Sequence, residues 1–178
     1  MEWLNEPARW SQEGDVITIT SGAQTDFWRK THDGGIRDSG HCYFQPVQGD
    51  FVAEVRFAAN YRALYDQAGM MVRADATTWL KCGVEFFEGV QCASVVVTRD
   101  FSDWSVLPMR EPPPVFWLRV ARHGSTFAVS YSANGQTYTM LRQAHLTEAE
   151  TLQVGVMVCA PTGGGVNATF EGFTVSEG

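Results

Sequence analysis

The chain has 178 residues, 44% of them hydrophobic and 19% charged, which is typical of a globular protein, and we expect one domain spanning residues 1–178. The formal net charge of −7 argues against a nucleic-acid-binding protein, which needs a basic footprint, and against docking on anionic lipid. No apolar run approaches the roughly 18 residues that a membrane span needs, so we predict no membrane partner.

The N-terminal stretch MEWLNEPARW has neither a basic segment nor an apolar segment, so we expect no secretory signal and a cytoplasmic location. Four cysteines are too few and too scattered for a disulfide framework, and none belongs to a CxxC pair. The sequence therefore predicts free thiols, no zinc site and no cofactor. The cysteines are Cys42, Cys82, Cys92 and Cys159.

In chain order, the first strand pattern is VITIT at residues 16–20. A stretch dense in Gly, Asp and aromatic residues follows, and we interpret it as a long ordered loop, residues 25–41, that enters a strand at about residues 41–44. Loops of this length inside a compact domain are usually functional or structurally pinned. The spacing of its aspartates does not match a calcium loop, so we predict no metal there. These aspartates are Asp26, Asp33 and Asp38.

Apolar residues then alternate along FVAEVRFAA, residues 51–59, which predicts a strand with one buried face. Three further antiparallel strands are predicted at residues 68–73, 80–86 and 93–99. The last two form a hairpin if Glu88 and Gly89 make its turn. In the strand at residues 51–59, the predicted buried residues are Phe51, Ala53, Val55 and Phe57.

The register of this hairpin separates its side chains into two kinds. With Phe87 opposite Val90, Glu85 lies opposite Cys92 and Trp79 lies opposite Thr98. One face is then apolar and forms the core. The other carries aromatic, charged and hydroxyl side chains and is the candidate ligand face. The predicted core residues are Leu80, Cys82, Val84, Phe86, Val95 and Val97.

The triplet Pro112–Pro114 marks a connector, after which FWLRVARHG alternates as a strand and Asn134–Gly135 predicts a hairpin turn. A capping box at Thr147–Glu150 predicts one short helical turn at about residues 148–152. LQVGVMVCAP and ATFEGFTV close the chain as strands. About ten or eleven short strands with almost no helix predict an all-β, two-sheet antiparallel sandwich, with a jelly roll as the favoured topology and a closed barrel as the alternative.

Three stretches, taken together and in order, resemble a family of regulation-of-enolase-like domains of unknown function, which are concanavalin A-like jelly rolls. The resemblance covers nearly the whole chain and implies the same two-sheet sandwich. It supplies no catalytic residue. It leads us to expect an aromatic pair around His32–Gly35, where this chain has Asp-Gly-Gly. The three stretches are TDFWRKTHDGGIRDSGH, DQAGMMVRADATTWLKCGVEFFEGVQCASVVVTRDFSDWS and VGVMVCAPTGGGVNATFEGFTV.

Sandwich-fold glycosidases of the retaining type need two carboxylates about 5 Å apart. Glu85 and Glu88 are three residues apart, so a strand would aim them at opposite faces, and Glu148–Glu150 falls in the predicted helical turn. There is no Gly-x-Ser-x-Gly elbow either. We interpret Cys92 as an inert cysteine rather than a thiol activated by His32. The sequence thus predicts no catalytic residues.

The polar face of the hairpin is the candidate ligand site. Trp79 would serve as a stacking platform beside hydrogen-bonding groups, and replacing it by Ala would then change stability little. The alternative is that Lys81 and Glu85 only pair with each other and that residues 25–41 cover Trp79. The predicted ligand-binding residues are Trp28, His32, Gln67, Arg73, Trp79, Lys81, Glu85, Ser94 and Thr98.

Three functions remain open. The favoured one is a non-catalytic binding domain that takes a carbohydrate or a similar small polar ligand on the concave sheet face. The second is a protein-interaction or regulatory domain, which the enolase-related family label suggests, and the least favoured is an enzyme acting on glycosides. An open groove of at least ~300 Å³ on this face supports a ligand, whereas a face plugged by residues 25–41 supports a structural role.

Overall fold

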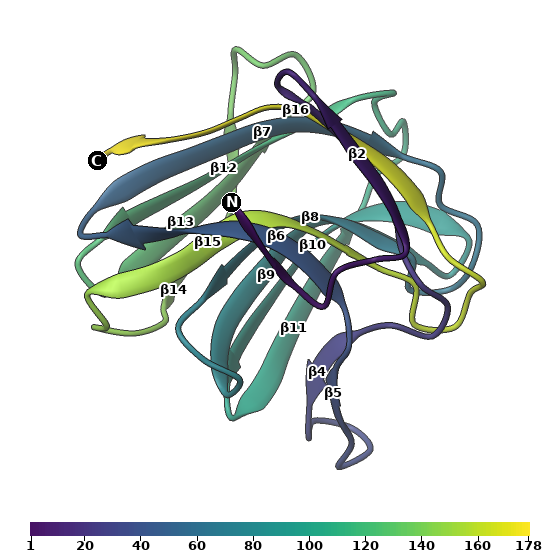
Figure 1. Ribbon diagram of the computed structural model, residues 1–178, viewed down its shortest axis with the longest axis horizontal. Helices are drawn as coiled ribbons and strands as arrows, with labels where there is room; N and C mark the ends of the chain where they lie inside the picture. The colour runs from purple at the N-terminus through teal and green to yellow at the C-terminus, as the bar shows by residue number, and fades with distance from the viewer.

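Sixteen β-strands and no helix make up residues 1–178 in the computed structural model (Figure 1). Two seven-stranded sheets, called here the first and the second sheet, pack against each other, and all their strand pairings are antiparallel. The all-β sandwich expected from the strand pattern is confirmed. No helix is present that is long and apolar enough to cross a membrane.

The strand order of the first sheet is β1 (Glu2–Leu4), β6 (His41–Gln48), β15 (Thr151–Cys159), β8 (Gln67–Arg73), β9 (Thr78–Phe87), β10 (Val90–Arg99) and β11 (Phe101–Pro108). The order of the second sheet is β14 (Thr139–His145), β13 (Thr126–Ser132), β12 (Phe116–His123), β7 (Phe51–Ala59), β16 (Asn167–Glu177), β3 (Val16–Thr20) and β2 (Arg9–Glu13). A separate hairpin consists of β4 (Phe27–Arg29) and β5 (Ile36–Asp38).

The core lies between the two sheets, because alternate side chains of every strand point to the facing sheet. The predicted inward residues of β7 are all buried. The predicted core residues of β9 and β10 are buried as well, except Phe86, which is half-buried. The buried ones are Leu80, Cys82, Val84, Val95 and Val97.

The pairing of β9 with β10 follows the predicted register, with Phe87 opposite Val90 and Trp79 opposite Thr98. Glu88 and Gly89 form the turn with φ values of 50° and 81°. Two consecutive residues with positive φ match a type I′ turn, whose twist suits a hairpin. This register fixes which side chains of β9 reach the outer face of the first sheet.

Two expectations about local structure are wrong. No helical turn forms at residues 148–152, since β15 begins at Thr151, and the Thr147 hydroxyl instead accepts the Ala149 N–H at 3.1 Å in a local turn. The edge strand β11 was not expected as a fourth strand after β10. Its sequence FSDWSVLP carries polar and exposed residues along most of its length, so its apolar pattern is weak.

The predicted long loop at residues 25–41 is largely the β4–β5 hairpin, which extends from the sandwich beside the first sheet (Figure 1). It covers part of the outer face of that sheet and creates a second apolar cluster there. We call this group the outer cluster. It consists of Phe27, Cys42, Phe44, Met71, Trp79, Val96, Met157 and Cys159.

All four cysteines are unpaired and buried, so the predicted free thiols are confirmed. Burial raises the pKa of the Cys42 thiol to about 12 and also raises the pKa values of Cys82 and Cys159. These thiols are therefore neutral near pH 7. Cys92 lies on β10 opposite Glu85, and burial raises the pKa of its thiol too.

Candidate ligand-binding groove

A groove of about 750 Å³ opens on the outer face of the first sheet, next to the β4–β5 hairpin. Gln67 of β8 and Lys81 and Glu85 of β9 contribute to its floor, while Trp28 of β4 and Trp104 of β11 contribute to its sides. This volume lies within the range of about 300–1,000 Å³ that is usual for small-molecule sites. The hairpin therefore covers only part of the face and leaves the rest open.

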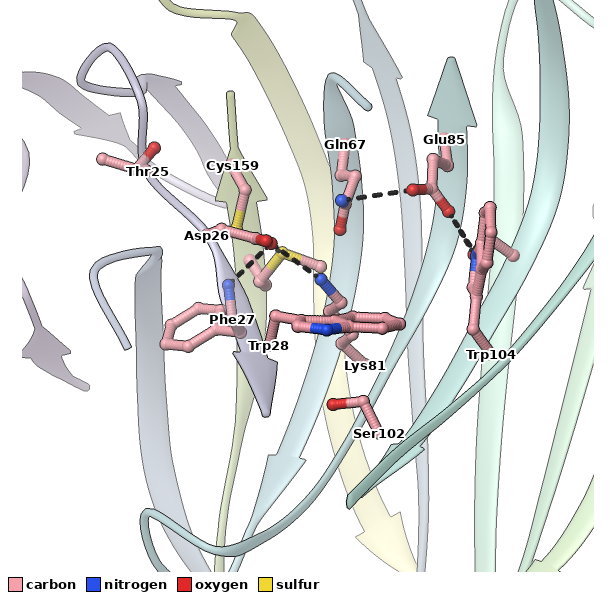
Figure 2. A network of polar contacts seen from close by, with 12 residues as sticks. Thr25, Asp26, Phe27, Trp28, Gln67, Lys81, Glu85, Ser102, Trp104 and Cys159 are labelled. Atoms are coloured by element: carbon pink, nitrogen blue, oxygen red, sulfur yellow. Dashed lines mark hydrogen bonds and ion pairs between the residues drawn. The ribbon is translucent and has the colours of Figure 1, made fainter. Parts of the chain in front are cut away.

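Lys81 is held in the floor by a buried ion pair. Its ammonium lies 3.1 Å from Asp26 Oδ1, and the same oxygen accepts the Phe27 N–H at 2.8 Å (Figure 2). Burial by itself lowers the pKa of a lysine, but the neighbouring Asp26 and Glu85 carboxylates outweigh it, so the pKa of Lys81 is raised. Lys81 is therefore cationic at neutral pH.

Glu85 lies four residues further along the same strand and is also buried, with 5% of its surface exposed. Its carboxylate accepts hydrogen bonds from Ser94 Oγ at 2.7 Å, Trp104 Nε1 at 2.8 Å and Gln67 Nε2 at 3.4 Å. Figure 2 shows Gln67 and Trp104 contacting it from two sides. Burial raises the pKa of Glu85, and the nearby Lys81 charge offsets this rise only in part.

Gly83 separates Lys81 from Glu85 and provides the space between them. Residues 81, 83 and 85 of β9 point to the same face, and Gly83 pairs with Gly69 of β8. A Cβ at Gly83 would lie 2.1 Å from the Ala68 carbonyl oxygen, so no larger residue fits this pairing. No side chain therefore projects from β9 between these two charged residues.

The structure brings together five of the nine predicted ligand-binding residues along the groove. These five are Trp28, His32, Gln67, Lys81 and Glu85. Ser94 does not line it but donates a hydrogen bond to the Glu85 carboxylate. Whether these side chains bind a ligand stays a prediction.

Besides Ser94, three other predicted residues do not line the groove. Trp79 is 1% exposed and packs in the outer cluster near Phe27, with ring centroids 6.2 Å apart. The expectation that it is an open stacking platform is therefore wrong, because the hairpin covers it. Arg73 is buried in a two-bonded ion pair with Asp38, at 2.7 and 2.8 Å. Thr98 is fully buried.

Lys81 and Glu85 do not pair with each other, which was one part of the alternative in which this face has no ligand. Lys81 pairs with Asp26 across the sheet face, and Glu85 receives only neutral donors. Thr98 is hydrogen-bonded to Ser102 at 2.9 Å, and Ser102 in turn receives the Arg29 N–H of the hairpin. These contacts fix the hairpin beside the groove.

The sequence analysis missed Asp26 and Trp104 as parts of the site. Trp104 lies on β11 opposite Val96, and Val96 lies opposite Lys81, so all three side chains share one face. Recognising β11 as a strand would have placed Trp104 there. Asp26 precedes a hairpin that returns over the sheet, and no local pattern indicates its partner 55 residues away.

Residues 3–178 match the model of a family described as "Protein of unknown function (DUF1349)". The chain is 37% identical over 174 residues to "Regulation of enolase protein 1" of Saccharomyces cerevisiae, covering 98% of this chain and 88% of the relative.

No cluster of three or more His, Cys, Asp or Glu side chains suited to a metal ion is found.

Solved structures show the same sandwich. A functionally unknown protein from Saccharomyces cerevisiae superposes with a TM-score of 0.96 at 37% identity, covering 99% of this chain and 96% of that chain. The GH43 protein BlXynB of Bacillus licheniformis, as its K247S mutant, superposes with a TM-score of 0.73 at 17% identity, over 97% of this chain but 36% of that chain. The second likeness shows the fold alone. On these matches, the chain belongs to the DUF1349 family of proteins of unknown function.

Proposed function

We propose that this protein is a non-catalytic binding domain whose groove takes a carbohydrate or a similar small polar ligand. The observation that carries the proposal is the pairing of fixed polar groups with aromatic side chains around one open groove. Lys81 and Glu85 are held in position by Asp26 and Trp104, so they are preorganised before a ligand arrives. Apolar walls with a few fixed polar groups are usual in small-molecule sites.

The polar floor retains hydrogen-bonding capacity for a ligand. A lysine ammonium has three N–H donors, and Lys81 makes one hydrogen bond, to Asp26. The Gln67 amide makes one long contact, 3.4 Å, with Glu85. A hydroxyl-rich ligand would satisfy these groups, while Trp28 and Trp104 would pack against its apolar faces.

A thermal-shift screen of neutral sugars, amino sugars and polar metabolites tests this proposal. A ligand that binds only the folded protein raises its melting temperature. The same increment is expected for Trp117→Ala, because Trp117 lies on β12 of the second sheet. Trp28→Ala, which removes one side of the groove, should lose the increment. A screen in which no compound stabilises the protein, or in which Trp28→Ala responds like the wild type, rules the proposal out.

The edge of β11 favours a second candidate, a protein-interaction domain. Phe101 is 59% exposed and Leu107 50% exposed on this strand, which pairs with β10 alone and leaves its other edge free. Edge strands with exposed apolar side chains are templates for pairing with another chain. The name of the yeast relative makes enolase the partner to test first.

Co-sedimentation of the protein with enolase from its own source measures this candidate directly. If β11 is the contact, the wild type forms a complex and Leu107→Asp weakens it, because the added charge disrupts the apolar edge. Leu64→Asp, at another exposed leucine outside the strands, is the control. Equal sedimentation of the mixture and of the separate proteins rules the contact out.

A further inference from the structure

The Glu85 carboxylate is buried without a cation within ion-pair distance. Its partners Ser94, Trp104 and Gln67 are all neutral donors. A carboxylate removed from water is strongly disfavoured unless it is protonated or paired with a positive charge. Within the groove, Glu85 is therefore the acidic group that lacks a counter-charge.

Every other carboxylate that lines the groove has a cationic partner of its own. The charges of these pairs cancel, so an ionised Glu85 leaves the floor with one net negative charge. An anionic ligand such as a phosphate or a uronic acid would meet this charge without compensation. The pairs are Asp26–Lys81 at 3.1 Å, Asp33–Arg37 at 2.5 Å and Asp103–Arg142 at 3.0 Å.

The titratable groups around Glu85 do not remove this charge. Lys81, on the same strand, already forms an ion pair with Asp26 of the segment before β4, so its charge is not free to neutralise Glu85. Cys92 faces Glu85 from β10, and burial keeps its thiol neutral by raising its pKa. The balance of Asp26, Lys81 and Glu85 is one negative charge when Glu85 is ionised.

Aromatic rings lie next to this carboxylate on the open side. Phe87 and Trp104 pack edge to face with centroids 5.0 Å apart, and Tyr65 stacks on Phe87 at 5.8 Å and meets Trp104 at 6.2 Å. All three rings are half-buried and line the groove. Aromatic faces beside a carboxylate are the arrangement that recognises organic ammonium groups, by cation–π attraction and by charge pairing.

We propose that the groove takes a small ligand carrying an organic ammonium group, which docks against Glu85 beside Tyr65, Phe87 and Trp104. This proposal rests on the proposed function, because it requires the same groove to be the binding site. It adds the chemical class of the ligand: an amino sugar or an alkylammonium compound rather than a neutral or acidic one. Amino sugars and alkylammonium compounds share the ammonium group, and the test below distinguishes between these two classes of ligand.

The test is isothermal titration calorimetry with two series of ligands, in each of which one member carries an ammonium group and its close analogues are uncharged. Glucosamine is compared with glucose and with N-acetylglucosamine, and choline is compared with its uncharged isostere 3,3-dimethylbutan-1-ol. The ammonium member of at least one series should bind roughly tenfold more tightly or better, as expected for one desolvated cation–π and charge contact. Binding by glucosamine identifies an amino-sugar site, and binding by choline identifies an alkylammonium site.

Glu85→Gln should abolish the preference for the charged member while leaving the fold intact, because a Gln carbonyl still accepts the Ser94 and Trp104 hydrogen bonds. Glu88→Gln is the matched control, since Glu88 lies exposed in the β9–β10 turn. The preference should also weaken as the pH falls and Glu85 becomes protonated. Because burial raises the pKa of Glu85, this loss begins at a higher pH than for an exposed glutamate.

The outcomes separate this proposal from the proposed function. If glucose binds as tightly as glucosamine and Glu85→Gln changes nothing, the ammonium proposal fails and the groove remains a site for neutral ligands. If none of the five compounds binds and the thermal-shift screen is also negative, both proposals fail. Equal binding of choline by the wild type and by Glu85→Gln likewise overturns the assignment of Glu85.

Discussion

The ion pair between Lys81 and Asp26 determines the geometry of the groove floor at the residue scale. Both side chains are largely removed from solvent, and the Asp26 carboxylate also accepts a backbone N–H at the start of β4. Removing one partner of a buried pair leaves the other charged and uncompensated, whereas removing both restores neutrality. The pair therefore ties the hairpin to the sheet as well as orienting Lys81.

Lys81→Met is expected to lower the free energy of unfolding by about 3–5 kcal/mol, because Asp26 is left buried without its partner. Urea unfolding followed by tryptophan fluorescence measures the loss. Adding Asp26→Asn should recover much of it. Arg142→Met, which breaks the more exposed pair with Asp103, should cost less than about 1 kcal/mol. A Lys81→Met protein as stable as Arg142→Met would contradict this account.

Trp79 shows what a sequence pattern leaves undetermined at this scale. Alternation correctly assigned it to the outer face with Lys81, but that face is covered at Trp79 and open at Glu85. The cover comes from Phe27, 52 positions earlier in the chain. Periodicity reports the face of a strand and carries no information about which distant segment lies over it.

Trp79→Ala is therefore expected to destabilise the protein by about 3–5 kcal/mol, as for large aromatic residues in a core. Sequence reasoning gave the opposite expectation, a small change in stability. Chemical unfolding distinguishes the two, with Trp117→Ala as a half-buried control on the second sheet. A loss below about 1 kcal/mol would mean that the hairpin does not cover Trp79.

The β9–β10 hairpin is the element that positions the site, and it was the most predictable part of the chain. A turn of two residues fixes its register. The pairs from Phe87–Val90 to Trp79–Thr98 follow from that turn. The β4–β5 hairpin was less predictable. Its strands have three residues each, and contacts such as Arg73–Asp38 and Arg29–Asp100 hold it in place.

Val84→Asp tests the β9 register, because Val84 is buried between the two sheets. An unpaired carboxylate there costs several kcal/mol, comparable with the stability of a typical domain, so cooperative unfolding should be lost. Circular dichroism during heating shows this directly. Val90→Asp, in the exposed turn region, should melt like the wild type. A folded, cooperatively melting Val84→Asp protein would refute the register.

On the scale of the whole molecule, the two-sheet sandwich was predictable because strand number, turn signals and the near absence of helix patterns agree. The depth of the groove was not, since it depends on three segments meeting: the β4–β5 hairpin, the centre of β9 and the edge strand β11. Weak alternation hid β11, and with it Trp104. The sequence therefore indicated the sheet face on which the groove lies, but not the segments that form its walls.

The central claim is that a ligand enters the groove between Trp28 and Trp104. The indole N–H signals of a ¹⁵N-labelled sample report it most directly, since each of the six tryptophans gives one signal, assigned by single Trp→Phe variants. On titration with the compound that raises the melting temperature most, the signals of Trp28 and Trp104 should shift and saturate together, while those of Trp10 and Trp117, away from the groove, stay in place. Unchanged Trp28 and Trp104 signals, or equal shifts at Trp10 and Trp117, would contradict the account.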